Sequence, residues 1–278
     1  MRPLVVSRPP EWVGHLILDR PGEFDVLTVS IPDVDRLTPS RFSGEVEGAY
    51  RHLGRQIRRR HRHPLRIWNF VPGIQTPTPD GNRYMAFNAG RLAGYREWFG
   101  SAEAMAGGMP TATAVGTTDA ALWVHVLLSD TPGRPVENPR QVPAYHYSRR
   151  FGMHPPCFAR GTLFESRLLI GGTASIVGED SRHCGSIEEQ TRETLINIAA
   201  LIASAGGCCE SAALRRLEQV RVHVREPRHA AVVRTMLADA AGGVASVEIV
   251  EAELCRPELL VEIEGHASCG GRAEGTKN

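Results

Sequence analysis

Residues 168–207 read LLIGGTASIVGEDSRHCGSIEEQTRETLINIAALIASAGG, and they contain a change from strand to helix. Strand candidates end at residue 177, and apolar residues then recur at helical spacing at Leu195, Ile198 and Ile202. The pair Gly206-Gly207 ends the helical pattern, since glycine readily adopts the left-handed conformation that follows many helices. We therefore predict a strand pair followed by a helix over 187–204.

The elements around this stretch form a plan that is used twice. In each copy the order is strand, strand, helix, strand, helix, strand, strand. The first copy is expected as strands 12–18 and 24–31, helix 41–60, strand 65–71, helix 83–99, and strands 111–116 and 121–128. The second copy is expected as strands 162–170 and 173–177, helix 187–204, strand 220–224, helix 227–241, and strands 245–252 and 259–264. Such a plan predicts an α+β protein with helices on one face of each mixed sheet.

The chain of 278 residues suits one large domain or two small ones. The repeat favours two, over residues 1–130 and 157–270, with the second as the catalytic domain. A polar, proline-rich segment joins them over 131–156 and is expected to contribute to the site. Residues 271–278 are expected to be a disordered tail. One domain with similar-looking elements is the alternative.

Composition excludes several classes of protein. The net charge is +1, so no global field attracts nucleic acid or a membrane surface. No apolar run reaches the length of a membrane span, and the first ten residues lack the apolar core of a signal peptide. The six cysteines show no CxxC spacing, so neither zinc nor a disulfide framework is favoured. We expect a cytoplasmic protein without a bound metal.

The second copy resembles the RidA/YjgF family. The residues that carry this resemblance are Ile170-Gly171-Gly172-Thr173-Ala174, Gln190, Asn197 and Leu259-Leu260-Val261-Glu262-Ile263-Glu264. RidA proteins are trimers with ligand sites between subunits, so the resemblance implies a pseudo-oligomeric arrangement with a site between the two copies. The family has a substrate-binding arginine at the start of its penultimate strand, where this chain has Val244-Ala245-Ser246. Imine deamination of the RidA kind is therefore disfavoured.

Four further motifs resemble the chorismatase family, in order, between about residues 65 and 265. They are NFVPGI at 69–74, FNAGR at 87–91, ENPRQVPAYHYSRRFG at 137–152 with FAR at 158–160, and GTASIVG at 172–178. The resemblance implies that the chain binds chorismate and releases its enolpyruvyl side chain as pyruvate, with no cofactor. Glu179 departs from the pattern, because the family often has histidine there, and this leaves the role of the loop open.

Chorismate is a dianion, so its site needs cations and an acid. Arg149, Arg150 and Arg160 are candidate anchors, since guanidinium groups bind carboxylates in a bidentate way. Tyr145 and Tyr147 can add hydroxyl groups and aromatic walls. The alternative is that these arginines cap a loop or form surface ion pairs.

Glu262 is the candidate acid. Strand alternation places Glu262 and Glu264 on one face, and Val261 and Ile263 on the other. The resemblance favours Glu262, because the corresponding RidA glutamate lines the ligand site; two exposed glutamates are the alternative. A carboxyl in a partly desolvated pocket has a raised pKa and can act as a general acid on the enol ether.

Cys255 and Gly172 bear on the product. They resemble the branch of the chorismatases that forms 3-hydroxybenzoate, whereas the dihydrodiol branch has alanine at both positions. We therefore expect 3-hydroxybenzoate, with Cys255 assisting the opening of an epoxide-like intermediate. A small buried hydrophobe is the alternative for Cys255. For the whole chain, the alternatives are chorismate hydrolysis to a dihydroxycyclohexadienoate and a non-catalytic RidA-like module that binds small carboxylates.

Overall fold

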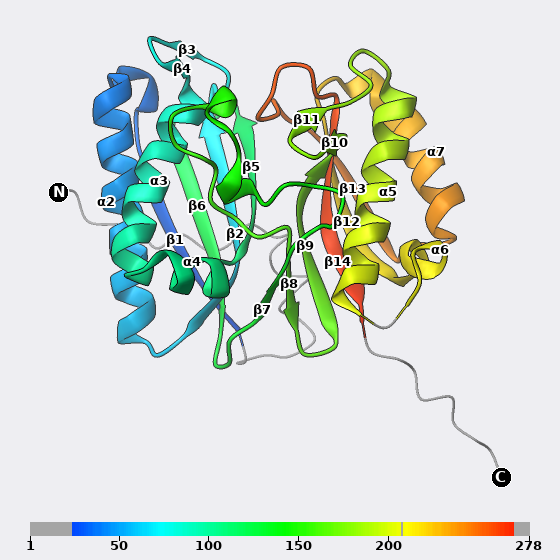
Figure 1. Ribbon diagram of the computed structural model, residues 1–278. Coiled ribbons are helices and arrows are strands. Elements are labelled where there is room, and N and C mark those ends of the chain that lie inside the picture. The colour runs from blue at the N-terminus through cyan, green and yellow to red at the C-terminus, as the bar shows by residue number, and fades with distance from the viewer. Residues whose placement is uncertain (1–23, 207, 270–278) are drawn as a thin grey trace.

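The structure is a computed structural model that describes residues 24–206 and 208–269. The expected strand 12–18 and the expected tail 271–278 lie outside the described residues. The remaining chain forms two mixed sheets, each covered by helices on one face (Figure 1).

The first sheet has the strand order β1-β6-β2-β5. Its strands are β1 (Phe24–Ile31), β2 (His63–Pro72), β5 (Thr111–Thr117) and β6 (Leu122–Ser129). Helices α2 (Pro39–Arg59) and α3 (Arg83–Phe99) begin at Thr38 and Asn82, whose side chains accept hydrogen bonds from the first turns. The apolar faces of both helices are buried in one core with the inward residues of the sheet.

The second sheet has the order β13-β12-β14-β9-β8-β7. Its strands are β7 (Arg134–Val136), β8 (Gly161–Phe164), β9 (Arg167–Ala174), β12 (Leu217–Val224), β13 (Ser246–Glu251) and β14 (Val261–Ser268). Helices α5 (Ile187–Ala205) and α7 (Ala230–Ala241) cover one face.

Short elements complete the chain. They are η1 (Val34–Arg36), β3 (Pro77–Thr78), β4 (Gly81–Asn82), α4 (Ala102–Gly108), η2 (Ala144–His146), η3 (Arg149–Phe151), β10 (Ile176–Val177), β11 (Asp180–Ser181), α6 (Glu210–Ala213), η4 (Leu214–Arg216) and η5 (Pro227–His229).

Within the described residues, which leave out the expected strand 12–18, the repeated order of elements is confirmed by the topology of the sheets. The order β1-β6-β2-β5 corresponds to β9-β14-β12-β13, and in both sheets the first two pairings are antiparallel and the last is parallel. The bounds of two expected strands were wrong. Residues 173–177 are divided between the end of β9 and β10, which pairs with β11 outside the large sheet. Residues 162–170 form the hairpin of β8 and β9, which reverses at Glu165, a residue with a positive φ of 53°.

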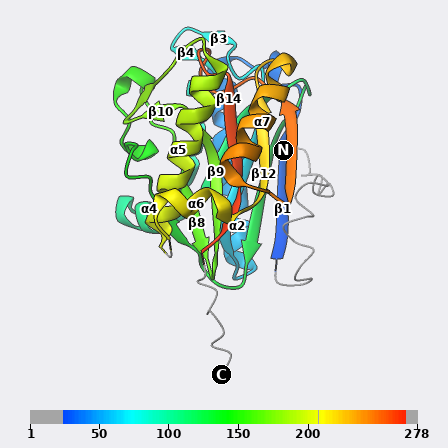
Figure 2. The same ribbon diagram turned by 90° about the vertical axis from the view of Figure 1, so that its right-hand side faces the viewer.

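The two sheets face each other, and the helices lie on the two outer sides (Figure 1). Figure 2 shows α5 and α7 in front of the second sheet, as expected for an outer layer. Between the sheets lies a small apolar cluster of Leu65, Trp68, Leu127 and Leu169. A second apolar cluster includes Val115 and Ala174, and the seam also contains buried polar residues such as Arg66 and Glu264.

Within 24–206 and 208–269, no single helix has the length and hydropathy of a membrane span. Two helices, Ile187–Ala205 and Glu210–Arg216, have this length and hydropathy when taken together, but a bend of 102° separates them.

Candidate active site

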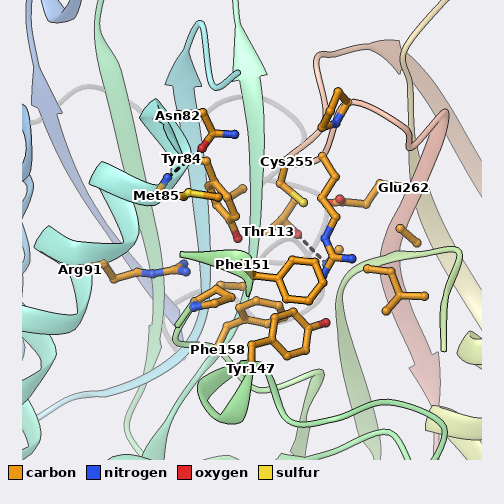
Figure 3. Close-up of a pocket in the computed structure, with 18 of the residues that line it drawn as sticks. Asn82, Tyr84, Met85, Arg91, Thr113, Tyr147, Phe151, Phe158, Cys255 and Glu262 are labelled. Atoms are coloured by element: carbon orange, nitrogen blue, oxygen red, sulfur yellow. Dashed lines mark hydrogen bonds between the residues drawn. The ribbon is translucent and has the colours of Figure 1, made fainter. Parts of the chain in front are cut away.

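A cavity of about 230 Å³ lies between the two sheets, where β5 faces β9 and β14. Helix α3, the joining segment that leads to β8 and the loop before β14 close its other sides. Figure 3 shows Arg91 entering from α3 on one side and Cys255 with Glu262 on the other, with Tyr147, Phe151 and Phe158 below. Both halves of the chain and the joining segment therefore build this cavity.

Glu262 is on the inter-sheet face of β14. Its neighbours Val261 and Ile263 are buried in the second core, so the predicted alternation of the strand is confirmed. The residue is 4% exposed, and its carboxyl makes no hydrogen bond to another described residue. Burial, with a further contribution from the charge of Glu264, raises its pKa to about 8. At neutral pH the carboxyl is therefore mostly protonated and can donate a proton to a ligand.

Gly172 lies directly beneath this carboxyl. A Cβ atom at position 172 would lie 2.0 Å from Oε1 of Glu262, so only glycine leaves room for the carboxyl in this position. Cys255 lies in the loop before β14 and also lines the cavity. Burial, with the nearby Glu262, raises the pKa of its thiol to about 12, so the thiol stays protonated.

Arg160 is the only one of the three predicted arginines that lines the cavity. It is 4% exposed, and its Nη2 donates to Tyr147 Oη at 2.8 Å and to the carbonyl oxygen of Val142 at 3.0 Å. Its guanidinium lies 5.0 Å from the ring centroid of Phe158. No described residue accepts a hydrogen bond from its Nε.

Arg91 provides a second buried cation near Phe158. It is 1% exposed, and its Nη2 donates to Asn88 Oδ1 at 2.8 Å. Its guanidinium lies 5.0 Å from the ring centroid of Phe87 and 5.9 Å from that of Phe158. Its Nε likewise has no acceptor among the described residues. Two guanidinium groups with unfilled donors thus lie near one aromatic ring at the cavity.

Arg256 is a third cation, at the mouth of the cavity. It lies 4.0 Å from the ring centroid of Phe151 and 5.5 Å from that of Tyr147, and its Nη1 donates to the carbonyl oxygen of Glu179 at 2.9 Å. The side chain of Glu179 accepts hydrogen bonds from the backbone N and the hydroxyl of Ser148, at 2.8 and 2.7 Å. The Glu179 loop therefore fixes the segment that carries Tyr147 and Phe151.

The structure does not bring Arg149, Arg150 and Tyr145 to the cavity, and this corrects the sequence prediction. Residues 149–151 form the short helix η3, which turns both arginines to the surface, where Arg150 pairs with Glu179 and Asp180. Tyr145 packs against the first core instead. The alternative reading of surface ion pairs thus holds for Arg150.

Sequence reasoning missed several residues that line the cavity: Asn82, Tyr84, Met85, Arg91, Thr113, Phe151, Phe158, Arg256 and Glu258. A signal for one of them exists. Tyr84, Phe87 and Arg91 are three and four positions apart on α3, so a buried arginine lies on the same face of the helix as two aromatic residues. A buried charge on such a face is rare unless it has a partner or a ligand. Burial also raises the pKa of Tyr84 above its usual value, so its phenol is a neutral donor.

Comparison with known proteins relates this geometry to one family. Residues 11–128 match the family described as chorismatase FkbO/Hyg5-like, N-terminal. A 3-hydroxybenzoate synthase from Streptomyces hygroscopicus is 33% identical over 215 residues, which are 72% of this chain and 62% of that protein. A crystal structure of a chorismatase matches with a TM-score of 0.78 and 28% identity, over 90% of this chain and 76% of that chain.

The chain thus matches a chorismatase family over residues 11–128 and is similar to chorismatases over most of its length. The predicted resemblance and the α+β fold class are thereby confirmed, whereas the pseudo-oligomeric arrangement stays a prediction. A solved member of the YjgF/YER057c/UK114 family from Mycobacterium tuberculosis covers 46% of this chain and 98% of its own, at 25% identity and a TM-score of 0.35. The chain spans only 62% of the length of its curated chorismatase relatives.

Proposed function

We propose that this protein cleaves chorismate to pyruvate and 3-hydroxybenzoate in the cavity between its two sheets, without a cofactor. The observation that supports this most is the combination, in one enclosed cavity, of a carboxyl that stays protonated at neutral pH with two buried arginines that have unfilled donors. The similarity to a 3-hydroxybenzoate synthase supports the same reaction.

Arg91 and Arg160 are the proposed anchors for the two carboxylates of chorismate. In an apolar cavity a guanidinium with an unpaired N–H is costly, and a bidentate carboxylate removes that cost while fixing the orientation of the ligand. Phe158 lines the cavity within about 6 Å of both cations and can provide a flat surface for the ring. The hydroxyls of Tyr84 and Tyr147 can donate further hydrogen bonds.

Glu262 is the proposed general acid. It donates its proton to the methylene carbon of the enol ether, which makes the side chain an oxocarbenium-like group. The bond between the ring carbon and the ether oxygen then breaks, and its electron pair completes the keto group of pyruvate. The neighbouring ring hydroxyl attacks the ring carbon and returns its proton to the Glu262 carboxylate. An epoxide-like intermediate results, and no water is consumed.

Cys255 is proposed to assist the opening of this intermediate. Its thiol stays protonated, so it donates to the ring oxygen and does not act as a thiolate nucleophile. Opening and loss of a ring proton then give the aromatic product.

Chorismate is the only proposed partner. The net charge of +1 gives no attraction for nucleic acid or membranes, and we expect the protein to act in the cytoplasm.

Incubation of the purified protein with chorismate tests this function. We expect pyruvate, measured by an enzymatic assay, and 3-hydroxybenzoate, identified by chromatography, in equal amounts. Binding of chorismate without release of pyruvate would instead support a non-catalytic binding module. Pyruvate together with a dihydroxycyclohexadienoate would assign the chain to the hydrolytic branch.

A further inference from the structure

A second buried carboxyl lies two positions after Glu262 on the same face of β14. Glu264 is 3% exposed, and its Oε2 lies 2.7 Å from Nη2 of Arg66, which extends from β2 in the other sheet. The hydroxyl of Thr113 also donates to Oε2, and Nε2 of His223 lies 3.5 Å from Oε1. The carboxyl of Glu262 has none of these partners.

The two carboxyls therefore have opposite protonation states. Burial alone would raise the pKa of Glu264, but the charge of Arg66 and the contacts with His223 and Thr113 hold it below its usual value. Glu264 is ionised at neutral pH, and its negative charge disfavours a second charge on Glu262. Paired carboxyls whose surroundings separate their pKa values in this way are a common basis for dividing acid and base roles.

Thr113 connects this pair to the floor of the cavity. Its hydroxyl donates to Glu264 and accepts a hydrogen bond from the backbone N of Gly172 at 3.0 Å. Because Gly172 lies directly beneath the carboxyl of Glu262, any shift of its backbone changes where that carboxyl lies. Arg66 also donates to the carbonyl oxygen of Gly265, which fixes β14 beyond Glu264.

We propose that Glu264 is a positioning residue for the acid Glu262. Glu264 supplies a fixed negative charge beside Glu262 and, through Thr113, fixes the backbone of Gly172, against which the Glu262 carboxyl packs. This inference rests on the proposed function, since it assigns Glu262 the role of proton donor. Glu264 does not line the cavity, so it acts through other residues rather than on the ligand.

Other charged and titratable groups surround both carboxyls and must stay in place during a test. Around Glu262 these are Tyr84 and Arg91 from α3, Tyr147 from the joining segment, Arg160 just before β8, His223 from β12, and Cys255, Arg256 and Glu258 from the loop before β14. Around Glu264 they are Arg66 from β2, and Arg221 and His223 from β12. Glu264→Gln removes one charge and keeps the shape of the side chain.

The expected result is a shift in the pH dependence of turnover. In the wild type, kcat/KM for chorismate should decline as the pH rises through about 8, because Glu262 loses its proton. In Glu264→Gln this decline should begin at lower pH, and kcat/KM at pH 9 should fall about tenfold for each unit by which the pKa of Glu262 falls. At pH 6 the loss should be much smaller. A merely structural role would lower kcat/KM by the same factor at every pH.

Glu193→Gln is the matched control. It also removes a largely buried carboxylate that pairs with an arginine, Arg140, but this pair lies outside the cavity. This control should leave both the rate and the position of the decline unchanged. If Glu264→Gln does not fold, the double variant Arg66→Met/Glu264→Gln removes the ion pair as a whole and avoids an unpaired buried cation. The same shift is expected in it.

Direct titration separates this inference from the proposed function. The carboxyl carbon of Glu262 can be followed by NMR in protein with ¹³C-labelled glutamate, assigned by comparison with Glu262→Gln. We expect its pKa to be lower in Glu264→Gln than in the wild type, whether or not chorismate is turned over. An unchanged pKa would overturn the inference even if the wild type releases pyruvate. Absence of turnover in the wild type would overturn the proposed function alone.

Discussion

The carboxyl of Glu262 lies free in a largely apolar cavity, and that of Glu264, on the same face of the same strand, is paired with Arg66. Strand alternation predicts that both face away from the core, and this is confirmed. It cannot predict which of them has a cationic partner, because Arg66 comes from a distant strand in the other sheet. For the same reason the sequence did not predict the orientation of Arg149 and Arg150. Both are close to Arg160 in sequence, but η3 turns them outward.

Glu262→Gln tests the acid directly. Glutamine keeps the shape of the side chain but cannot donate the proton, so we expect release of pyruvate to fall by about a hundred-fold or more. Chorismate binding, measured by calorimetry, should persist because Arg91 and Arg160 are unchanged. A loss of only a few-fold would show that another residue is the acid.

Cys255→Ala and Gly172→Ala should have different effects. Loss of the thiol removes a donor beside the ring, so Cys255→Ala should keep most of the pyruvate release and shift the ring product towards the dihydrodiol. The added Cβ of Gly172→Ala would lie 2.0 Å from Oε1 of Glu262, so this variant must displace the acid and should slow pyruvate release more. Rates and chromatography of both products check this. Equal rates, with 3-hydroxybenzoate as the sole product of both, would show that neither residue governs the reaction.

Most helices and strands were predictable from periodicity and from their end signals. Helix 83–99 and strand 24–31 agree with α3 and β1, since each combines a regular apolar pattern with a clear boundary. The hairpin of β8 and β9 was not predicted, because Glu165-Ser166 carries none of the glycine or asparagine signals that usually indicate a tight turn. Arg91 was missed because an arginine usually indicates the exposed face of a helix, whereas this arginine is buried.

The contact between α2 and α3 depends on glycine. A Cβ atom at position 94 would lie 2.5 Å from Cβ of Tyr50, whereas one at position 44, on the exposed side of α2, would meet no atom within 4 Å. We therefore expect Gly94→Ala to destabilise the protein by about 1–3 kcal/mol through overpacking. Gly44→Ala should stabilise it by up to about 1 kcal/mol, because alanine is the better helix former. Chemical denaturation of both variants measures these changes, and equal midpoints would contradict the close packing of the helices.

At the scale of the whole molecule, the site combines three distant parts of the chain. Arg91 and Thr113 come from the first sheet and its helices, and Gly172 and Glu262 come from the second sheet, as does Arg160, which directly precedes β8. Tyr147 comes from the segment that joins the two halves. The sequence predicted two similar halves and a site between them. It could not predict which strands face each other, because the seam is held by contacts between distant residues such as Arg66 and Glu264.

A crystal structure of Glu262→Gln with chorismate tests the central claim most directly, since this variant should bind the substrate without cleaving it. The account predicts the ring in the cavity between the sheets, against Phe158, with one carboxylate on Arg91 and the other on Arg160. The methylene carbon of the enolpyruvyl group should lie within contact distance of the side chain at position 262. Chorismate bound elsewhere, or bound in the cavity with its methylene carbon turned away from that side chain, would contradict the account.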